Sequence, residues 1–159
     1  MRFREATPAD AAEIFRLYRS LLTMEGVTWD EEYPDESFVS GDLREHGLFV
    51  LEEDGCIAAA VSAVRDEDME DNPVWDRALL PAVMIERVAV RRDFQGRGLS
   101  RQAICSAMEE MKKRGFRGAR YLVGPKNLRA RAAYRPLAFR LAGEVDAYGE
   151  HWLCYEKEL

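Results

Sequence analysis

The chain has 159 residues, of which 47% are hydrophobic and 33% charged, as expected for one globular domain spanning residues 1–159. Its net charge of −6 argues against a nucleic-acid partner, and its charged amino-terminal region and short apolar runs predict neither a signal peptide nor a membrane partner. Its three widely spaced cysteines form no Cys-x-x-Cys pair, which argues against a zinc site and secreted disulfides, so we expect a cytoplasmic protein without a metal.

Hydrophobic periodicity and turn residues predict a series of strands and helices. In chain order these are a strand at 3–6, helices at 7–22 and 35–45, a hairpin of strands at 48–52 and 56–64, a strand at 83–90, a helix at 99–114, a strand at 119–123, a helix at 127–137, and strands at 139–145 and 152–156. Thr7-Pro8-Ala9-Asp10 is typical of a capped helix start, and Asp54-Gly55 is typical of a tight hairpin turn. This order favours a mixed α/β sheet over a doubly wound parallel one.

Charged residues are divided unevenly along the chain. Residues 1–86 carry 21 acidic and 7 basic side chains, whereas residues 87–159 carry 8 acidic and 16 basic ones. If the two halves are also separated in space, the first attracts cations and the second attracts anions. A solvated surface of uneven composition is the alternative interpretation, and the sequence leaves both open.

The loop after the strand at 83–90 has the features of a phosphate site. Gly96 and Gly98 stand where a helix begins, and the first turn of a helix leaves N–H groups without partners. Glycine lets the backbone approach a phosphate closely, and Arg92, Arg97 and Arg101 would add positive charge around it. The segment lacks the Gly-Lys-Ser/Thr of a P-loop and the third glycine of a dinucleotide fingerprint. A glycine turn that merely precedes a helix is the alternative.

A second segment lies 32 residues beyond Gln95, at residues 127–139. Asn127, Ala130 and Tyr134 are spaced so that they share one face of a helix. Taken alone, Tyr134 is better interpreted as a half-buried core aromatic residue.

Together the two segments resemble the motifs of the GNAT superfamily of N-acetyltransferases. Gln95-Gly96-Arg97-Gly98-Leu99-Ser100 resembles the Gln/Arg-x-x-Gly-x-Gly/Ala loop that binds acyl-CoA in that family, and residues 127–139 resemble its Asn-x-x-Ala-x-x-x-Tyr-x-x-x-Gly-Phe segment. The resemblance implies an α/β fold with a mixed, mostly antiparallel central sheet, a splayed fourth strand near Ile85–Val90, and helices on both faces.

The chain departs from the family pattern at three positions. Ser100 stands where Gly or Ala is usual, and Ala138 stands where Gly is usual. Pro136 lies late in the helix that carries Tyr134 and is expected to end that helix early.

The resemblance implies an enzyme that transfers an acetyl group from acetyl-CoA, its cosubstrate, to an amine that attacks directly. In the family the pyrophosphate binds the loop amides, the pantetheine arm pairs with the splayed strand, and a tyrosine, matched here by Tyr134, protonates the departing thiolate. The residues that match the family's coenzyme contacts are Val88, Val90, Gln95, Gly96, Arg97, Gly98, Leu99, Ser100, Arg101 and Asn127.

An amine acceptor must lose a proton before it attacks, because a lysine-like amine has a pKa of about 10.4. Glu86 alternates with Val88 and Val90 along the strand, so we expect its carboxylate to point to the same side and to accept that proton. The alternatives are a glutamate on a solvated face or paired with Arg87, and a reaction in which water takes the proton.

The segment between the first two helices forms the acceptor side in relatives. Here it is acidic and aromatic, and we expect Trp29, Glu31 and Tyr33 to contact a small cationic amine. The alternative for Trp29 and Tyr33 is that they only pack the loop onto the sheet.

Three other functions remain open at this point. A non-catalytic acyl-CoA-binding regulatory module would keep the loop and lose the acid. A protein or peptide acetyltransferase would use the same chemistry on a larger acceptor. A nucleic-acid binder would use the basic residues between 112 and 140, although it lacks a recognised motif. Relatives are often homodimers, and the sequence does not settle whether this chain is one.

Overall fold

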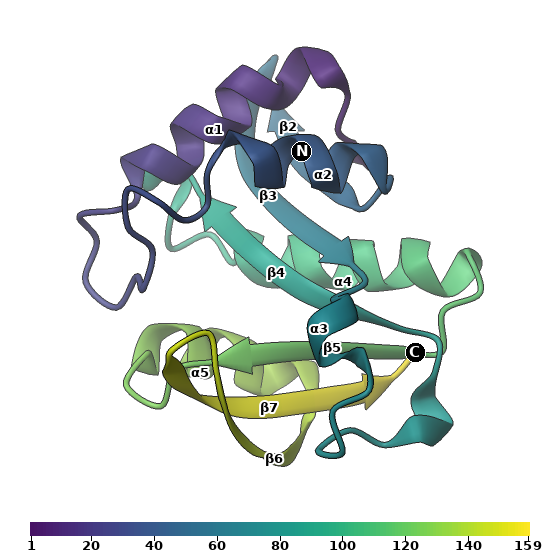
Figure 1. Ribbon diagram of the computed structural model, residues 1–159. Coiled ribbons are helices and arrows are strands. Elements are labelled where there is room, and N and C mark those ends of the chain that lie inside the picture. The colour runs from purple at the N-terminus through teal and green to yellow at the C-terminus, as the bar shows by residue number, and fades with distance from the viewer.

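The computed structural model describes residues 1–159 and contains one seven-stranded sheet in the order β1-β2-β3-β4-β5-β7-β6 (Figure 1). The strands are β1 (Arg2–Glu5), β2 (Leu48–Glu53), β3 (Cys56–Val64), β4 (Ala82–Val90), β5 (Gly118–Val123), β6 (Arg140–Ala147) and β7 (Glu150–Glu158). All neighbouring strands are antiparallel except β4 and β5, which are parallel. The predicted mixed, mostly antiparallel sheet is confirmed.

The two central strands, β4 and β5, are paired only where they begin. Residues 82–84 lie opposite residues 118–120, and no further pair follows. Beyond this point β4 stays paired with β3 as far as Val90, and β5 stays paired with β7 as far as Val123. Figure 1 shows the two strands running apart toward the left of the view. The predicted splayed fourth strand is therefore present.

Helices cover both faces of the sheet, as predicted. They are α1 (Ala11–Ser20), α2 (Glu36–Arg44), α3 (Glu67–Glu70), α4 (Leu99–Lys113) and α5 (Leu128–Tyr134). Four short 3₁₀ turns accompany them, at Pro8–Asp10, Arg77–Leu79, Arg92–Phe94 and Arg135–Leu137. Figure 1 shows α1 and α2 in front of the sheet and α4 behind it. No helix of the structure is long and apolar enough to cross a bilayer.

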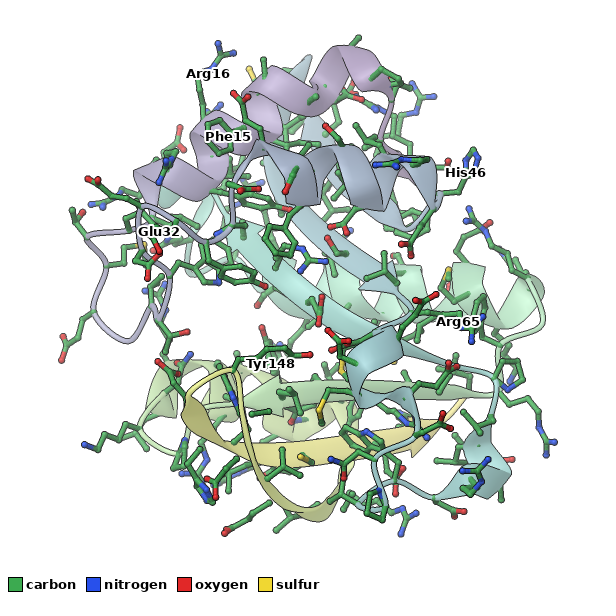
Figure 2. The ribbon with its side chains drawn as sticks, in the orientation of Figure 1. Phe15, Arg16, Glu32, His46, Arg65 and Tyr148 are labelled. Atoms are coloured by element: carbon green, nitrogen blue, oxygen red, sulfur yellow. The ribbon has the colours of Figure 1, made fainter.

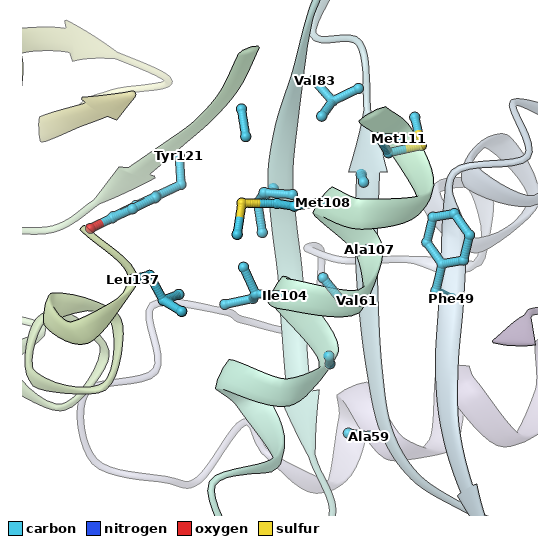
Figure 3. Close-up of a cluster of buried hydrophobic side chains, with 14 of the residues drawn as sticks. Phe49, Ala59, Val61, Val83, Ile104, Ala107, Met108, Met111, Tyr121 and Leu137 are labelled. Carbon is cyan, nitrogen blue, oxygen red and sulfur yellow. The ribbon is translucent and has the colours of Figure 1, made fainter. Parts of the chain in front are cut away.

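Two apolar clusters attach the helices to opposite faces of the sheet. On β2, Val50 packs with the α1 side chains, whereas its neighbours Phe49 and Leu51 pack with those of α4. This alternation follows from the strand pleat, which points successive side chains to opposite faces. The α4 face is the larger cluster, in which Ile104, Met108 and Met111 lie against the strands (Figure 3).

Local sequence signals account for most element boundaries. The Thr7 N–H donates to the Asp10 carboxylate at 2.7 Å, as the capping residues predict, and Asp54-Gly55 connects β2 to β3. Pro136 lies in a 3₁₀ turn directly after Tyr134, so α5 ends where the proline predicts.

Two local features depend on side-chain contacts. Phe38 is 37% exposed because its ring lies at the cleft described below, against Tyr33 and beneath the Arg87 guanidinium. The acidic connection at residues 65–80 contains α3 and the 3₁₀ turn at Arg77–Leu79. These form because Asp66 and Asp76 each accept a backbone N–H two residues ahead.

Candidate active site

A cleft of about 860 Å³ opens where β4 and β5 separate. Its walls come from these two strands, the loop after α1, one side of α2, the segment leading into α3, α5 and the β6–β7 turn. Nine of the residues expected at the site line it: Trp29, Tyr33, Glu86, Val88, Val90, Gln95, Ser100, Asn127 and Tyr134. Segments distant in the sequence therefore meet here because the sheet is open at its centre.

The loop between β4 and α4 holds its glycines in the left-handed region of backbone space. Gly96 has φ of +77° and Gly98 has φ of +74°, and this conformation is strained for residues with a Cβ. The six N–H groups from Gly96 to Arg101 have no hydrogen-bond acceptor within the protein. By contrast, the Gln95 N–H donates to the Arg92 carbonyl at 3.3 Å, so the run of free donors begins at Gly96.

This row of donors fits a diphosphate. Free N–H groups at the start of a helix, together with the helix dipole, bind anionic oxygens, and α4 has 15 residues over which that dipole builds up. A Cβ at Gly96 would meet no atom within 4 Å, so the loop surface there is open to a ligand. The coenzyme expected from the sequence therefore fits the main-chain groups present.

Side chains fix this loop to its surroundings. Gln95 Nε2 donates to the Val90 carbonyl at 3.1 Å, and Gln95 Oε1 accepts from Arg129 Nη2 at 2.8 Å. Arg92 donates to the Ser20 carbonyl at 2.9 and 3.1 Å, which ties the loop to the end of α1. These contacts hold the free donors in one conformation.

The expected basic side chains take different positions around the loop. Arg97 forms a two-bond ion pair with Glu53, with both N–O distances 3.0 Å, and lies outside the cleft lining. Leu99 is 4% exposed and its side chain packs in the core, so it contributes only a free N–H to the loop. Arg101 has no ion-pair partner and remains available to an anion near the loop.

The backbone of β4 presents unpaired groups along the cleft. The Arg91 N–H donates to Ala58 of β3 at 2.9 Å, and backbone groups alternate in direction along a strand. The backbone groups of Val88 and Val90 therefore face the opposite edge, where β5 has moved away. The Val90 carbonyl accepts from Gln95 there, which leaves the Val90 N–H and the Val88 groups without a partner. This open edge can pair with an extended ligand.

A β-bulge in β4 contradicts the expectation that Glu86 points to the same side as Val88 and Val90. Ser62 of β3 lies opposite Glu86, and Ala60 lies opposite Ala89, so β4 has one extra residue between them. Arg87 accommodates this extra residue by adopting a φ of +47°. As a result Val88 and Val90 pack toward α4, whereas Glu86 lies on the face that carries α2.

Glu86 reaches the cleft nevertheless, because the strand edge there is uncovered. Its carboxylate lies 2.7 Å from Arg87 Nη1, and 22% of its side chain is exposed. Burial raises the pKa of Glu86 to about 6, with the nearby carboxylates Asp66 and Asp42 also raising it and Arg87 opposing them. A carboxyl group with this pKa can accept a proton near neutral pH.

Tyr134 stands on the opposite wall, at the last residue of α5. Its ring packs edge-on against Tyr121, with centroids 5.2 Å apart, and its hydroxyl has no hydrogen-bond partner in the protein. Burial raises the pKa of Tyr134 to about 12, so its proton is retained at neutral pH. The side chain is therefore both a core aromatic residue and a proton-bearing group at the cleft.

Asn127 and Ala138 delimit the segment that carries Tyr134. The Asn127 side chain caps α5 by accepting the Ala130 N–H at 3.1 Å, and its residue also lines the cleft. Ala138 adopts φ of +59°, in the region that favours glycine, which explains why the family pattern has glycine there.

The expected acceptor residues separate into two groups. Trp29 packs edge-on against the buried Tyr18, and the Tyr33 hydroxyl accepts from Arg87 Nη1 at 3.1 Å; both line the cleft. Glu31 is exposed and does not line it. The reason is local: Asp30 Oδ1 accepts the N–H groups of Glu32 and Tyr33, a turn that leaves Glu31 at the loop's outer tip.

The sequence did not identify most other residues of the cleft, and four of these bear on its chemistry: Asp42, Asp66, Arg87 and Tyr148. Arg87 was considered only as a partner for Glu86. The Tyr148 hydroxyl donates to Asp66 at 2.9 Å, and Figure 2 shows this side chain reaching from the β6–β7 turn toward the space between β4 and β5. No spacing in the sequence connects these positions, because they lie on four different segments.

The raised pKa of Glu86 makes a pH-dependent contribution to stability. Since the pKa rises from 4.5 to about 6 on folding, the contribution is present below pH 4.5 and is lost as the pH rises through 6. We expect the free energy of unfolding of the wild type, relative to Glu86→Gln, to fall by about 2 kcal/mol across this interval. Urea unfolding of both proteins at a series of pH values measures this difference, and a constant difference would contradict the assignment.

The sequence and the fold are both similar to those of known acetyltransferases. The model of the acetyltransferase (GNAT) family matches residues 12–139. No curated protein matches the sequence. Among solved structures, an acetyltransferase of the GNAT family from Listeria monocytogenes superposes with a TM-score of 0.79 at 23% identity, covering 99% of this chain and 94% of that one.

Two other solved structures have the same fold. A ribosomal-protein-alanine N-acetyltransferase from Brucella melitensis gives a TM-score of 0.77 at 19% identity over 100% of both chains. A putative acetyltransferase from Salmonella typhimurium, solved with its cofactor acetyl-CoA, gives 0.76 at 17% identity over 99% of this chain and 93% of that one. Because the family model covers most of the sequence and both of its motif segments, this chain belongs to the acetyltransferase (GNAT) family.

Proposed function

We propose that this protein is an N-acetyltransferase that transfers an acetyl group from acetyl-CoA to a primary amine of a small cationic acceptor, by direct attack with both substrates bound. The observation that carries the proposal is the row of six free N–H groups from Gly96 to Arg101 beside an open strand edge. Main-chain donors of this kind are suited to a diphosphate. When bound, acetyl-CoA supplies the activated acetyl group and a thiol leaving group.

The open edge of β4 provides the next contact. The Val88 N–H faces the cleft and can donate to the carbonyl oxygen of the acyl group, where negative charge develops during attack. Val90 offers its backbone further along the same edge, toward the glycine loop. These groups are held by the β3–β4 pairing, so they need little reorganisation when a substrate binds.

Glu86 and Tyr134 divide the proton transfers between the two walls. Glu86, with its pKa of about 6, can take a proton from the acceptor amine directly or through a water molecule. Tyr134 retains its proton at neutral pH and its hydroxyl is free, so it can donate to the departing sulfur. Because β4 and β5 separate, Glu86 and Tyr134 lie on opposite walls of the cleft. Glu86 can therefore meet the amine while Tyr134 meets the departing sulfur.

Charge at the cleft favours a cationic acceptor. Glu45, Asp68 and Glu150 line the cleft and have no ion-pair or hydrogen-bond partner. The arginines that line it are all engaged: Arg65 with Glu70, Arg87 with Asp42 and Glu86, and Arg129 with Gln95. An acceptor with a second positive charge is therefore attracted, and one with a free carboxylate finds no unpaired arginine.

A peptide amino terminus is the second candidate acceptor. The Brucella melitensis structure with the same fold is that of a ribosomal-protein-alanine N-acetyltransferase, although fold alone does not determine the acceptor. A peptide would place its amine at Glu86 as a small amine does. The acceptor measurements below separate the two, and a protein that binds CoA without turnover would be the regulatory module instead.

The role of the glycine loop can be tested with two matched substitutions. Gly96→Ala and Gly55→Ala both introduce a Cβ at φ of +77° with no atom within 4 Å, so each should cost about 1 kcal/mol of stability. Only Gly96 lies in the loop of free donors. We expect Gly96→Ala to weaken CoA binding at least about tenfold in isothermal titration calorimetry, while Gly55→Ala binds as the wild type does. Equal affinities for both variants would place the diphosphate elsewhere.

Tyr134→Phe tests the proton donor. We expect CoA affinity to be retained and kcat to fall by about 10² or more, because a general acid contributes that much. Tyr155→Phe is the matched control, since Tyr155 also stacks on Tyr121, with centroids 4.9 Å apart, but does not line the cleft. Release of free thiol from acetyl-CoA measures the rate, and a fully active Tyr134→Phe would remove this assignment.

A panel of amines tests the acceptor class. We expect kcat/KM to be highest for diamines, lower for neutral monoamines and peptide amino termini, and lowest for amino acids with a free carboxylate. Asp68→Asn and Glu150→Gln should each lower kcat/KM for diamines about two- to fivefold, as removal of one exposed ion pair does. Glu158→Gln, at the exposed end of β7, serves as the control. A preference for peptides over every small amine would favour the second candidate.

A further inference from the structure

A buried ion network lies beneath the acceptor side of the cleft. Asp42 of α2 is 5% exposed, Arg87 of β4 is 7% exposed and Ser62 of β3 is fully buried. Burying charged groups is costly unless they are paired and hydrogen-bonded. Asp42 lines the cleft but takes no part in the proton transfers proposed above.

The geometry connects Asp42 to Glu86 through a single guanidinium. Arg87 Nε and Nη2 donate to the two carboxylate oxygens of Asp42, each at 2.8 Å, and the Ser62 hydroxyl donates to the same carboxylate. Arg87 Nη1 is left for Glu86 Oε2 at 2.7 Å and the Tyr33 hydroxyl at 3.1 Å. The bulge at Arg87 makes this arrangement attainable, because it places adjacent residues 86 and 87 on the same face of the sheet.

We propose that Asp42 is a positioning residue for the reaction: by binding two of the three Arg87 nitrogens, it orients the third toward Glu86 and neutralises the guanidinium charge, so that Glu86 remains basic enough to deprotonate the acceptor. The inference rests on the proposed function of Glu86. It extends that function to a residue of α2 that touches neither substrate.

The pKa of Glu86 depends on how the positive charge of Arg87 is shared between the neighbouring carboxylates. The charged and titratable groups that face Glu86 are Arg87 on its own strand, Asp42 from α2, Asp66 before α3, Tyr33 from the loop after α1, and Tyr148 from the β6–β7 turn. Of these, only Arg87 favours the ionised carboxylate by its charge. With Asp42 present, the Arg87 charge is largely compensated, and burial and Asp66 raise the pKa of Glu86. Without Asp42, the uncompensated charge of Arg87 would lower the pKa of Glu86.

A purely structural role for the Asp42–Arg87 pair is the competing explanation, since the pair also joins α2 to β4. The two explanations differ in the sign of their effects on Glu86. A structural role predicts lost stability and lost rate at every pH, whereas the positioning role predicts a shift of the titration of Glu86 in a direction set by which charges remain.

The first experiment is the substitution Asp42→Asn. We expect the acid limb of the pH profile of kcat/KM to move down by about one pH unit or more, and the plateau to fall about three- to tenfold because a weaker base assists less. The same shift should be visible without substrate, in the carboxyl NMR signal that is lost in Glu86→Gln. Glu156→Gln is the matched control: it removes another buried carboxylate paired with an arginine, outside the cleft, and should leave the profile in place.

A double variant keeps the proposal testable if Asp42→Asn folds poorly. Replacing both charges, as Asp42→Asn with Arg87→Met, removes the buried pair together, which proteins tolerate better than loss of one partner. Glu86 then keeps its burial and Asp66 without any nearby cation, so its titration should move above pH 6. Opposite shifts in the two variants support the proposal, and an unshifted Glu86 signal in both overturns it. Because the NMR titration needs no turnover, an inactive protein with shifted signals would refute only the proposed function.

Discussion

The separation of β4 from β5 is the constraint on which the rest of the site depends. After three residue pairs the two strands stop sharing hydrogen bonds, so the centre of the sheet has an edge that neither strand covers. An uncovered edge in the middle of a sheet leaves backbone groups and side chains of both strands accessible. The cleft, the exposed Val88 and Val90 backbone, and the access of Glu86 to the cleft all follow from it.

Two local departures from regular backbone geometry lie within β4 and directly after it. In the loop after β4, Gly96 and Gly98 adopt positive φ where the run of free N–H groups begins; within the strand, the bulge at Arg87 turns Glu86 toward the face that carries α2. The sheet and α4 hold both the loop N–H groups and the Glu86 carboxylate in fixed positions.

The acidic first part and the basic second part of the sequence supply different elements of the fold. Residues 1–86 supply β1 to β3, the start of β4 and the helices α1 to α3, whereas the rest of the chain supplies the glycine loop, α4, β5 and α5. The unpaired carboxylates Glu45 and Asp68 of the first part line the cleft, and so does the unpaired Glu150 of the second part. This arrangement is consistent with a cationic acceptor meeting an anionic coenzyme.

The sequence by itself determined the succession of the seven strands and of every helix except α3, the hairpin at Asp54-Gly55, the glycine loop and the end of α5 at Pro136, because each depends on residues close together in the chain. It also placed Tyr134 and Asn127 on one helix face. Only the tertiary structure decided the side to which Glu86 points and the pairing of Asp42 with Arg87. The reason is physical: a one-residue bulge reverses the side-chain alternation without any signal in the local pattern, and ion pairs between α2 and β4 form only after the sheet brings the two elements together.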